Sequence, residues 1–216
     1  YSNDEYTQFM NSALVNAPSA LLPSYDAGVA ADWQIGSWSL TGVMMQVGED
    51  DAGKNYGFLG VQAERTVDLS IGPGTYRVVL GGTSNDFPRP DTGRDSRRRW
   101  LLISIDQQFA PNIGGFMRVG WQDDDAAIDC KALYSAGIDF DGALWNRSGD
   151  NLGVAYAWLR GGNLDIDNSH VGEAYYRFAV SAGLSFTADL QFISEKVDNG
   201  DGPEGWIPGI RTTFEF

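Results

Sequence analysis

The sequence has one cysteine, one histidine and few basic residues. Cys130 has no second cysteine with which to form a disulfide inside the chain. Catalytic triads built on histidine and metal sites built from several histidines are excluded by count, because His170 stands alone. Only 15 Lys and Arg residues balance 29 Asp and Glu residues, and the resulting net charge of -14 argues against a nucleic-acid partner.

Long hydrophobic runs are also missing. No stretch approaches the roughly 18 to 20 apolar residues of a membrane-spanning helix, and the mean hydropathy is -0.26. A membrane is not thereby excluded, because a strand of a transmembrane barrel needs only about ten residues of alternating character. With 216 residues and 27 glycines, the chain suits one large β domain or a part of a bigger one.

From residue 26 onward, apolar and polar residues alternate with a period of two. Met117, Val119 and Trp121, for example, alternate with Arg118 and Gln122, which is typical of a β-strand with two different faces. Residues 1–25 instead predict a short segment that is partly helical or irregular. The pattern predicts an all-β fold of eleven strands, at 26–34, 38–48, 57–68, 74–83, 99–109, 114–122, 131–141, 151–160, 172–182, 184–193 and 208–216.

The connections between these strands are expected to alternate in length. Short turns are expected at 35–37, 69–73, 110–113, 142–150 and 183, and longer polar loops at 49–56, 84–98, 123–130, 161–171 and 194–207. Bacterial outer-membrane barrels have tight periplasmic turns and longer external loops. The alternation therefore favours a transmembrane antiparallel β-barrel over a soluble sandwich.

The last strand carries the same pattern to the end of the sequence. Ile210, Phe214 and Phe216 share one face, whereas Arg211 and Glu215 share the other. A final aromatic residue that closes an alternating strand resembles the C-terminal signal of bacterial outer-membrane barrels. The alternative for this stretch alone is an edge strand of a soluble sheet.

Charged residues inside the expected strands predict a water-filled lumen, because a charge on the lipid face at mid-depth costs about 2 to 4 kcal/mol. Arg65 is the exception, since it falls on the lipid side; either a β-bulge shifts the register or its side chain reaches the interface. The other candidates would either contact solute or only hydrate and cross-brace the lumen. They are Glu64, Arg77, Asp106, Gln108, Arg118, Gln122, Asp139, Arg177, Asp189, Gln191, Arg211 and Glu215.

A basic loop interrupts the acidic background between Pro88 and Trp100. Its arginines are Arg89, Arg94, Arg97, Arg98 and Arg99. Three hypotheses compete for this loop: a surface loop paired with its own aspartates, a contact for lipopolysaccharide phosphate, or a loop that folds into the pore to bind polar solute. Arginine suits the last two because its planar guanidinium donates pairs of hydrogen bonds to phosphate, carboxylate or sugar hydroxyl groups.

No catalytic constellation is visible in the sequence, so we expect no enzymatic activity and no cofactor. The acidic stretch from Asp198 to Glu204 has a loose likeness to a calcium-binding loop without its full ligand spacing. A solvated acidic loop is the favoured interpretation there, and we expect no metal site.

Several stretches in order along the chain carry a family resemblance. Gly72, Pro73, Tyr76 and Arg77 form a turn followed by the start of a strand. Further stretches of this kind lie at 9–33, 106–108, 142–156, 173–176, 189–193 and 208–216. Together they resemble the carbohydrate-selective porin family, the OprB-type outer-membrane channels. The resemblance implies a barrel of about sixteen strands, of which this chain would form the C-terminal portion.

A barrel of that size needs strands beyond the eleven expected here. Counting back from a periplasmic C-terminus makes residues 1–25 an external loop segment and residues 26–216 the barrel strands. We expect the N-terminal portion of the same barrel as a partner, separated from this chain at an external loop, where proteolysis concentrates.

These expectations predict an outer-membrane porin, a passive diffusion channel for small hydrophilic solutes and above all carbohydrates. The expected partners are outer-membrane lipid, lipopolysaccharide and permeating sugars. Two alternatives remain open: a structural outer-membrane barrel component of a larger complex, and a soluble β-sandwich protein that binds sugar.

Overall fold

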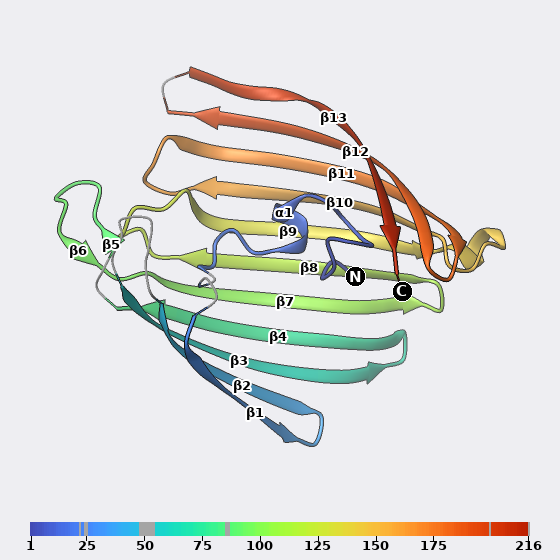
Figure 1. Ribbon diagram of the computed structural model, residues 1–216, viewed down its shortest axis with the longest axis horizontal. Coiled ribbons are helices and arrows are strands. Elements are labelled where there is room, and N and C mark those ends of the chain that lie inside the picture. The colour runs from blue at the N-terminus through green and yellow to red at the C-terminus, as the bar shows by residue number, and fades with distance from the viewer. Residues whose placement is uncertain (22, 24–25, 48–54, 85–86, 199, 216) are drawn as a thin grey trace.

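The computed structural model contains one large antiparallel sheet (Figure 1). It describes residues 1–21, 23, 26–47, 55–84, 87–198 and 200–215. Eleven strands form the sheet in the order β1-β2-β3-β4-β7-β8-β9-β10-β11-β12-β13, so each strand pairs with its neighbours in sequence. A single sheet replaces the two packed sheets of a sandwich, which removes the soluble sandwich as the fold.

The elements follow one another along the chain with little helix. The sheet strands are β1 (Gly28–Ile35), β2 (Trp38–Val47), β3 (Tyr56–Leu69), β4 (Gly72–Thr83), β7 (Arg99–Ala110), β8 (Ile113–Gln122), β9 (Cys130–Asp141), β10 (Asn151–Gly161), β11 (Ile166–Ser181), β12 (Leu184–Val197) and β13 (Gly200–Phe214). The remaining elements are α1 (Ser12–Val15), the hairpin strands β5 (Phe87–Pro88) and β6 (Asp95–Ser96), and the 3-10 helix η1 (Gly142–Trp145). The eleven predicted strands are confirmed. No helix among the described residues is long and apolar enough to cross a membrane.

The two ends of the sheet differ in their connections. At one end, here called the short-turn end, the strands are joined by residues 36–37, 70–71, 111–112, 142–150 and 182–183. At the other, the long-loop end, they are joined by residues 48–55, 84–98, 123–129, 162–165 and 198–199. The first three connections at the long-loop end are long, as predicted, and the second of them carries the β5–β6 hairpin.

The last two connections at the long-loop end are much shorter than predicted. Strand β11 begins at Ile166, and β12 and β13 continue to Val197 and from Gly200, so most of 161–171 and 194–207 is strand. The sole histidine, His170, therefore lies in a strand and pairs with Trp158 of β10. Beyond the apolar belt both faces of a strand can be polar, so the alternation that marks a strand is lost while the backbone pairing continues.

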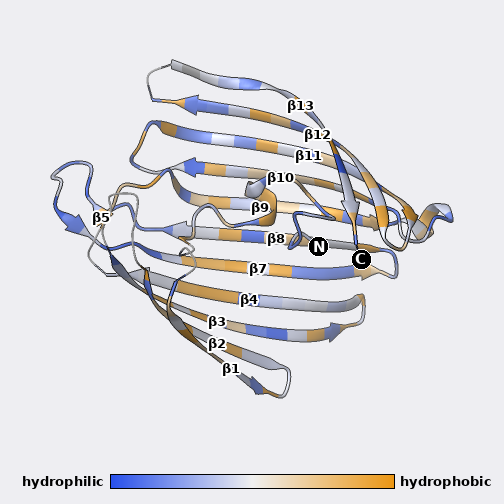
Figure 2. Cartoon of the chain, viewed as in Figure 1, coloured by the Kyte–Doolittle hydropathy of each residue, from blue (hydrophilic) through white to orange (hydrophobic). Residues whose placement is uncertain are grey.

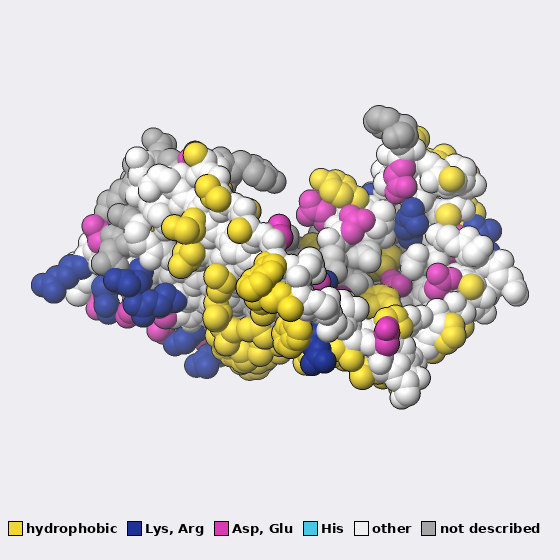
Figure 3. Space-filling model, turned by 90° about the horizontal axis from the view of Figure 1, so that it is seen from below, with side chains coloured by type: hydrophobic (Ala, Val, Ile, Leu, Met, Phe, Trp, Pro, Cys, Tyr) yellow, Lys and Arg dark blue, Asp and Glu magenta, His cyan; other side chains and the backbone are white. Residues whose placement is uncertain are grey.

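The outer face of the sheet is apolar. Exposed apolar side chains recur at alternate positions on most strands of the sheet, as at Met117 and Trp121 of β8, Tyr156 and Trp158 of β10, and Ile210 of β13, which is 85% exposed. Hydrophobic and hydrophilic positions are interspersed along the strands (Figure 2), and hydrophobic side chains gather on the outer surface (Figure 3). The alternation predicted for the last strand continues to Phe214, and Phe216 lies outside the described residues.

Arg65 lies on the apolar outer face, near the short-turn end. The pairing of β3 with β2 and with β4 runs through Arg65 without a shift of register, so no bulge is present there. Its guanidinium carbon lies 5.3 Å from the centre of the Trp38 ring. Of the two hypotheses for Arg65, the structure therefore favours a side chain that lies on the outer face beside an interfacial aromatic residue.

Residues 1–21, here called the inner segment, lie against the concave face of the sheet (Figure 1). Phe9 and Leu14 of this segment are fully buried. The Phe9 ring meets Tyr175 of β11 at 4.9 Å and Phe116 of β8 at 5.8 Å, edge to face in both pairs. The strands at the two edges, β1 and β13, do not pair with each other, so the barrel is not closed.

The turn between β9 and β10 is held by a buried carboxylate. Arg147 donates from Nε to Oδ2 of Asp150 at 2.6 Å, and the Tyr176 hydroxyl donates to the same oxygen at 2.5 Å. The backbone N–H of Ala179 donates to Oδ1 at 2.9 Å, which ties the turn to β11. The hydrogen bond from Arg147 is the largest cause of a lowered pKa of Asp150, from 3.8 to about 2.

The first prediction compares adjacent positions on opposite faces of β3. Val61 is exposed on the outer face, whereas Gln62 is a polar residue on the concave face. Val61→Arg is expected to lower the free energy of unfolding by about 2 to 4 kcal/mol, and Gln62→Arg to lower it much less. Urea titration of the protein folded into phospholipid vesicles measures both. Equal losses would contradict the assignment of faces.

The second prediction concerns the Asp150 turn and pH. A lowered pKa means that the ionised carboxylate stabilises the fold above pH 4, and that this contribution is lost as the pH falls from about 4 to about 2. Asp150→Asn should therefore melt below wild type at neutral pH, with a difference that shrinks toward pH 2. Thermal unfolding followed by heat-dependent electrophoretic mobility checks this. A difference that stays constant with pH would contradict it, and Asp165→Asn at the opposite end serves as the control.

Candidate functional site

The charged residues of the strands form rows across the concave face. Cross-strand partners share a face, so the register places Glu64, Arg77, Ser104, Arg118 and Ser135 in one row. The three neighbouring rows run through Asp106, Phe116, Gly137, Ala155, Glu173 and Gln191; through Asp139, Gly153, Tyr175, Asp189 and Gly209; and through Arg177, Thr187 and Arg211. The predicted lumen residues thus lie on the face opposite the apolar surface.

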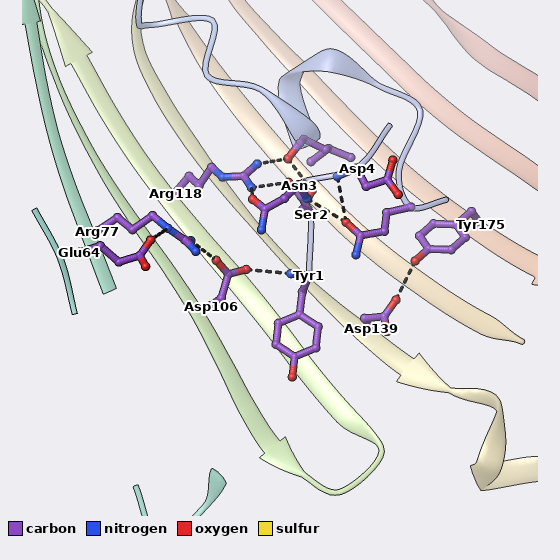
Figure 4. A network of polar contacts seen from close by, with 12 residues as sticks. Tyr1, Ser2, Asn3, Asp4, Glu64, Arg77, Asp106, Arg118, Asp139 and Tyr175 are labelled. Atoms are coloured by element: carbon purple, nitrogen blue, oxygen red, sulfur yellow. Dashed lines mark hydrogen bonds and ion pairs between the residues drawn. The ribbon is translucent and has the colours of Figure 1, made fainter. Parts of the chain in front are cut away.

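Glu64, Arg77 and Asp106 form an ion-pair chain on β3, β4 and β7 (Figure 4). Arg77 donates from Nε to Glu64 Oε2 at 2.5 Å and from Nη1 to Asp106 Oδ2 at 2.6 Å. The side chains of Arg77 and Glu64 keep 24% and 26% of their surface exposed, so this part of the concave face is open to solvent. The other oxygen of Asp106 accepts a hydrogen bond from the amino group of Tyr1 at 2.8 Å.

Arg118 lies beneath the inner segment and has only 4% of its surface exposed. It donates to the backbone carbonyls of Leu14 and Ser2, and at 2.7 Å to the side-chain oxygen of Asn3. Its guanidinium is satisfied by the segment rather than by a carboxylate across the sheet. The buried charge of Arg118 is therefore stabilised by the inner segment, and Arg118 in turn holds the segment against β8.

Glu173 of β11 is the second anchor of the inner segment, and it is 3% exposed. Its two carboxylate oxygens accept from the backbone N–H groups of Met10 and Asn11, at 2.6 Å and 2.9 Å. The Asn11 side chain donates to Gln191 of β12 at 3.0 Å. A single carboxylate thus fixes two successive backbone donors of the segment.

Arg211 of β13 holds the opposite side of the inner segment. It donates from Nη1 to the carbonyl of Glu5 and from Nη2 to the carbonyl of Gln8, both at 2.7 Å. The Thr213 hydroxyl donates to the carbonyl of Tyr6 at 3.0 Å. Residues from β8, β11 and β13 therefore form hydrogen bonds with the inner segment at points spread across the sheet.

Asp139 is buried within the wall. It accepts from the Tyr175 hydroxyl at 2.7 Å and from the Asn151 amide at 2.9 Å. The Tyr175 ring lies over Gly153, where a β-carbon would come within 2.2 Å of a ring carbon. Glycine at that position lets the aromatic ring lie flat on the sheet.

The remaining lumen candidates lie apart from these groups. Gln108 donates to the carbonyl of Pro111 at the short-turn end, and Gln122 accepts from Arg98 at the long-loop end. Arg177 donates to Ser185 Oγ at 3.1 Å and lies 3.9 Å from Glu215. Asp189 accepts from the side chain of its near neighbour, Gln191, at 2.9 Å. These contacts cross-brace the wall.

The basic loop lies at the rim of the long-loop end. Arg89 pairs with Asp91 at 3.3 Å and with Asp125 at 3.5 Å, so part of the loop is paired with aspartates. Arg98 lies over the Phe87 ring at 5.7 Å. Three further arginines of the loop are exposed: Arg94, Arg97 and Arg99.

The outer face of the sheet carries grooves. One groove is lined by Trp38, Arg65, Tyr76, Ile103 and Ile105, which point outward. In the part of the chain that the structure describes, no three His, Cys, Asp or Glu side chains converge as a metal ion would require. The concave wall presents hydrogen-bond donors and acceptors, such as those of Glu64 and Arg77.

Glu173 is a functional residue that the sequence pattern did not single out. It alternates in step with Tyr175 and Arg177 in the same predicted strand, so the sequence pattern does predict that its side chain lies on the concave face. Its contact with Met10 joins residues 163 positions apart, and no local pattern indicates that pairing.

Comparison with known proteins adds to this geometry. The model of the carbohydrate-selective porin family, OprB, matches residues 1–216. An uncharacterized protein of Aquifex aeolicus (strain VF5) is 29% identical over 217 residues, which cover 100% of this chain and 59% of that protein. The chain thus spans about three-fifths of the length of this relative.

Two solved structures share the fold. The high-pH structure of Pseudomonas putida OprB has a TM-score of 0.71 and 14% identity, covering 94% of this chain and 60% of that chain. Pseudomonas aeruginosa OccK11 (OpdR) has a TM-score of 0.62 and 12% identity, covering 87% of this chain and 57% of that chain.

The third prediction tests the anchor at Glu173. Glu173→Gln replaces one of the two acceptor oxygens with an amide NH2, which leaves one buried backbone N–H without its partner at a cost of about 1 to 3 kcal/mol. The amides of Met10 and Asn11 should therefore exchange with deuterium about tenfold faster or more. Glu195→Gln on β12, which does not touch the segment in the described structure, is the control. Unchanged exchange at both amides would contradict the anchoring.

Proposed function

Because the chain belongs to the carbohydrate-selective porin family OprB, we propose that its protein is an outer-membrane channel for passive diffusion of small hydrophilic solutes, chiefly carbohydrates. Solutes move down their gradient, and neither a cofactor nor a covalent step takes part. The chain covers three-fifths or less of its relatives, so the activity belongs to the whole protein of which these strands form a part.

One observation carries this proposal: the sheet is apolar on its convex face and lined by rows of charged and amide side chains on its concave face. The first face suits lipid and the second suits water. A sugar exchanges hydrogen bonds with water for hydrogen bonds with such side chains, and the half-buried Glu64 and Arg77 can offer them.

We further propose that the inner segment is an external loop that folds back into the channel and narrows it. Strand β1 runs from residue 28 toward the short turn at 36–37, so the chain enters it from the long-loop end. Arg118, Glu173 and Arg211 hold the segment against the wall and are committed to it. Glu64 and Arg77, beside it, would then line the remaining passage.

The open edges β1 and β13 require partners in a membrane, because unpaired backbone groups in hydrocarbon cost several kcal/mol each. We propose that strands of the N-terminal portion of the same barrel supply them. Outer-membrane lipid would surround the apolar face, and lipopolysaccharide would meet the rim of the long-loop end.

A plugged structural barrel is the second candidate, and the inner segment on the concave face is the observation that favours it. Conductance separates the two. The intact protein, purified in detergent and inserted into a planar bilayer, should conduct ions, and added sugar should reduce that current while it occupies the passage. Absence of conductance would overturn the channel in favour of the plugged barrel.

The fourth prediction uses the same bilayer. Arg77→Gln removes the cation that pairs with Glu64 and with Oδ2 of Asp106, which keeps only the Tyr1 amino group, so the reversal potential in a salt gradient should shift toward greater cation selectivity. Arg65→Gln removes the same charge from the outer face and should leave the potential unchanged. No shift with Arg77→Gln would show that the ion-pair chain lies away from the conducting path.

A further inference from the structure

A broad groove lies on the outer face where β1 to β4 approach the long-loop end. Its volume is about 1110 Å³, above the roughly 300 to 1,000 Å³ typical of sites for drug-sized ligands. The outward apolar side chains that line it are Val29, Met44, Leu59, Val61 and Leu80. A large and mainly apolar occupant therefore fits this surface.

A missing side chain deepens the groove. One cross-strand row runs from Val29 through Met44 and Leu59 to Gly82 and Arg99. A β-carbon at Gly82 would have as its nearest neighbours Arg98 O at 3.3 Å and Arg99 Cγ at 3.7 Å, so the glycine leaves a gap between Leu59 and the arginine. This row of side chains is therefore apolar on β1 to β3 and ends in the guanidinium group of Arg99 on β7.

Arginines form the end of the groove at the rim. Arg97 and Arg99 both line it, and both are exposed. They belong to the arginine-rich stretch of a chain whose net charge is -14. The backbone N–H of Arg99 donates to Asp123 at 3.2 Å, and Asp95 lies in the β5–β6 hairpin of the same stretch. Basic side chains gather at one end of the surface beside the hydrophobic patch (Figure 3).

We propose that this groove holds the lipid A part of a lipopolysaccharide molecule, with its two phosphates at Arg97 and Arg99 and its acyl chains along the apolar floor. The planar guanidinium groups donate paired hydrogen bonds to phosphate, and the floor replaces water around the chains. Lipid A lies in the outer leaflet, so it can reach this groove only if the long-loop end faces outside the cell. The lipid A site therefore rests on the proposed function, which gives the long-loop end that orientation. A diphosphorylated headgroup accounts for two exposed arginines at the same end better than a single phosphodiester does.

The intact protein, purified in detergent free of lipopolysaccharide, is titrated with Kdo2-lipid A, and the bound fraction is measured by native mass spectrometry. The double variant Arg97→Gln with Arg99→Gln should weaken binding about tenfold or more, because charge-assisted hydrogen bonds are lost. Arg97→Lys with Arg99→Lys keeps the charge and should retain most of the affinity. Gly82→Leu should weaken binding by filling the floor.

Arg65→Gln is the matched control, since it removes a charge from the same face at the opposite end and should bind as wild type. Equal binding by the double glutamine variant would overturn the site, and so would equal binding of lipid A that lacks its phosphates. Phosphatidylglycerol that binds as tightly as lipid A would assign the groove to a phospholipid instead. Conductance should be unaffected by the double variant, so failure of the lipid site and failure of the channel are distinguishable.

Discussion

The backbone hydrogen bond between neighbouring strands is the constraint on which this structure depends. In hydrocarbon no water can satisfy an unpaired N–H or C=O group, so the strands must pair along their whole membrane depth. Pairing fixes the register, and a shift by one residue would turn every side chain to the opposite face. The continuous register through β2, β3 and β4 shows this, since it keeps Arg65 on the apolar face at the cost of placing a charge there.

The concave wall follows from the same register, yet it is not complete by itself. Arg77 pairs with two carboxylates within the sheet, whereas Arg118 and Glu173 bond to the backbone of the inner segment. A buried charge without hydrogen bonds would be strongly destabilising. The wall and the segment are therefore one unit, in which side chains of the sheet satisfy backbone groups of the segment and Phe9 fills the space between them.

Much of the fold could be predicted from local pattern, because lipid on one side and water on the other impose a strict alternation on each strand. That pattern was sufficient for the eleven strands and for the direction of residues such as Arg118 and Asp189. It failed for 161–171 and 194–207, where water can reach both faces and Gly, Asp and Asn give no strand signal. The pairing of Glu173 with Met10 could not be predicted, since it depends on where a distant irregular segment comes to rest.

The inner segment makes the free cross-section of a barrel independent of its lipid-facing perimeter. In an empty barrel, the number of strands sets both the lipid-facing perimeter and the free cross-section. Here residues 1–21 occupy part of the concave side while contributing no strand to the sheet. In the proposed channel, insertions or substitutions in that segment would therefore change the opening in small steps, whereas adding strands changes the perimeter by a whole hairpin at a time.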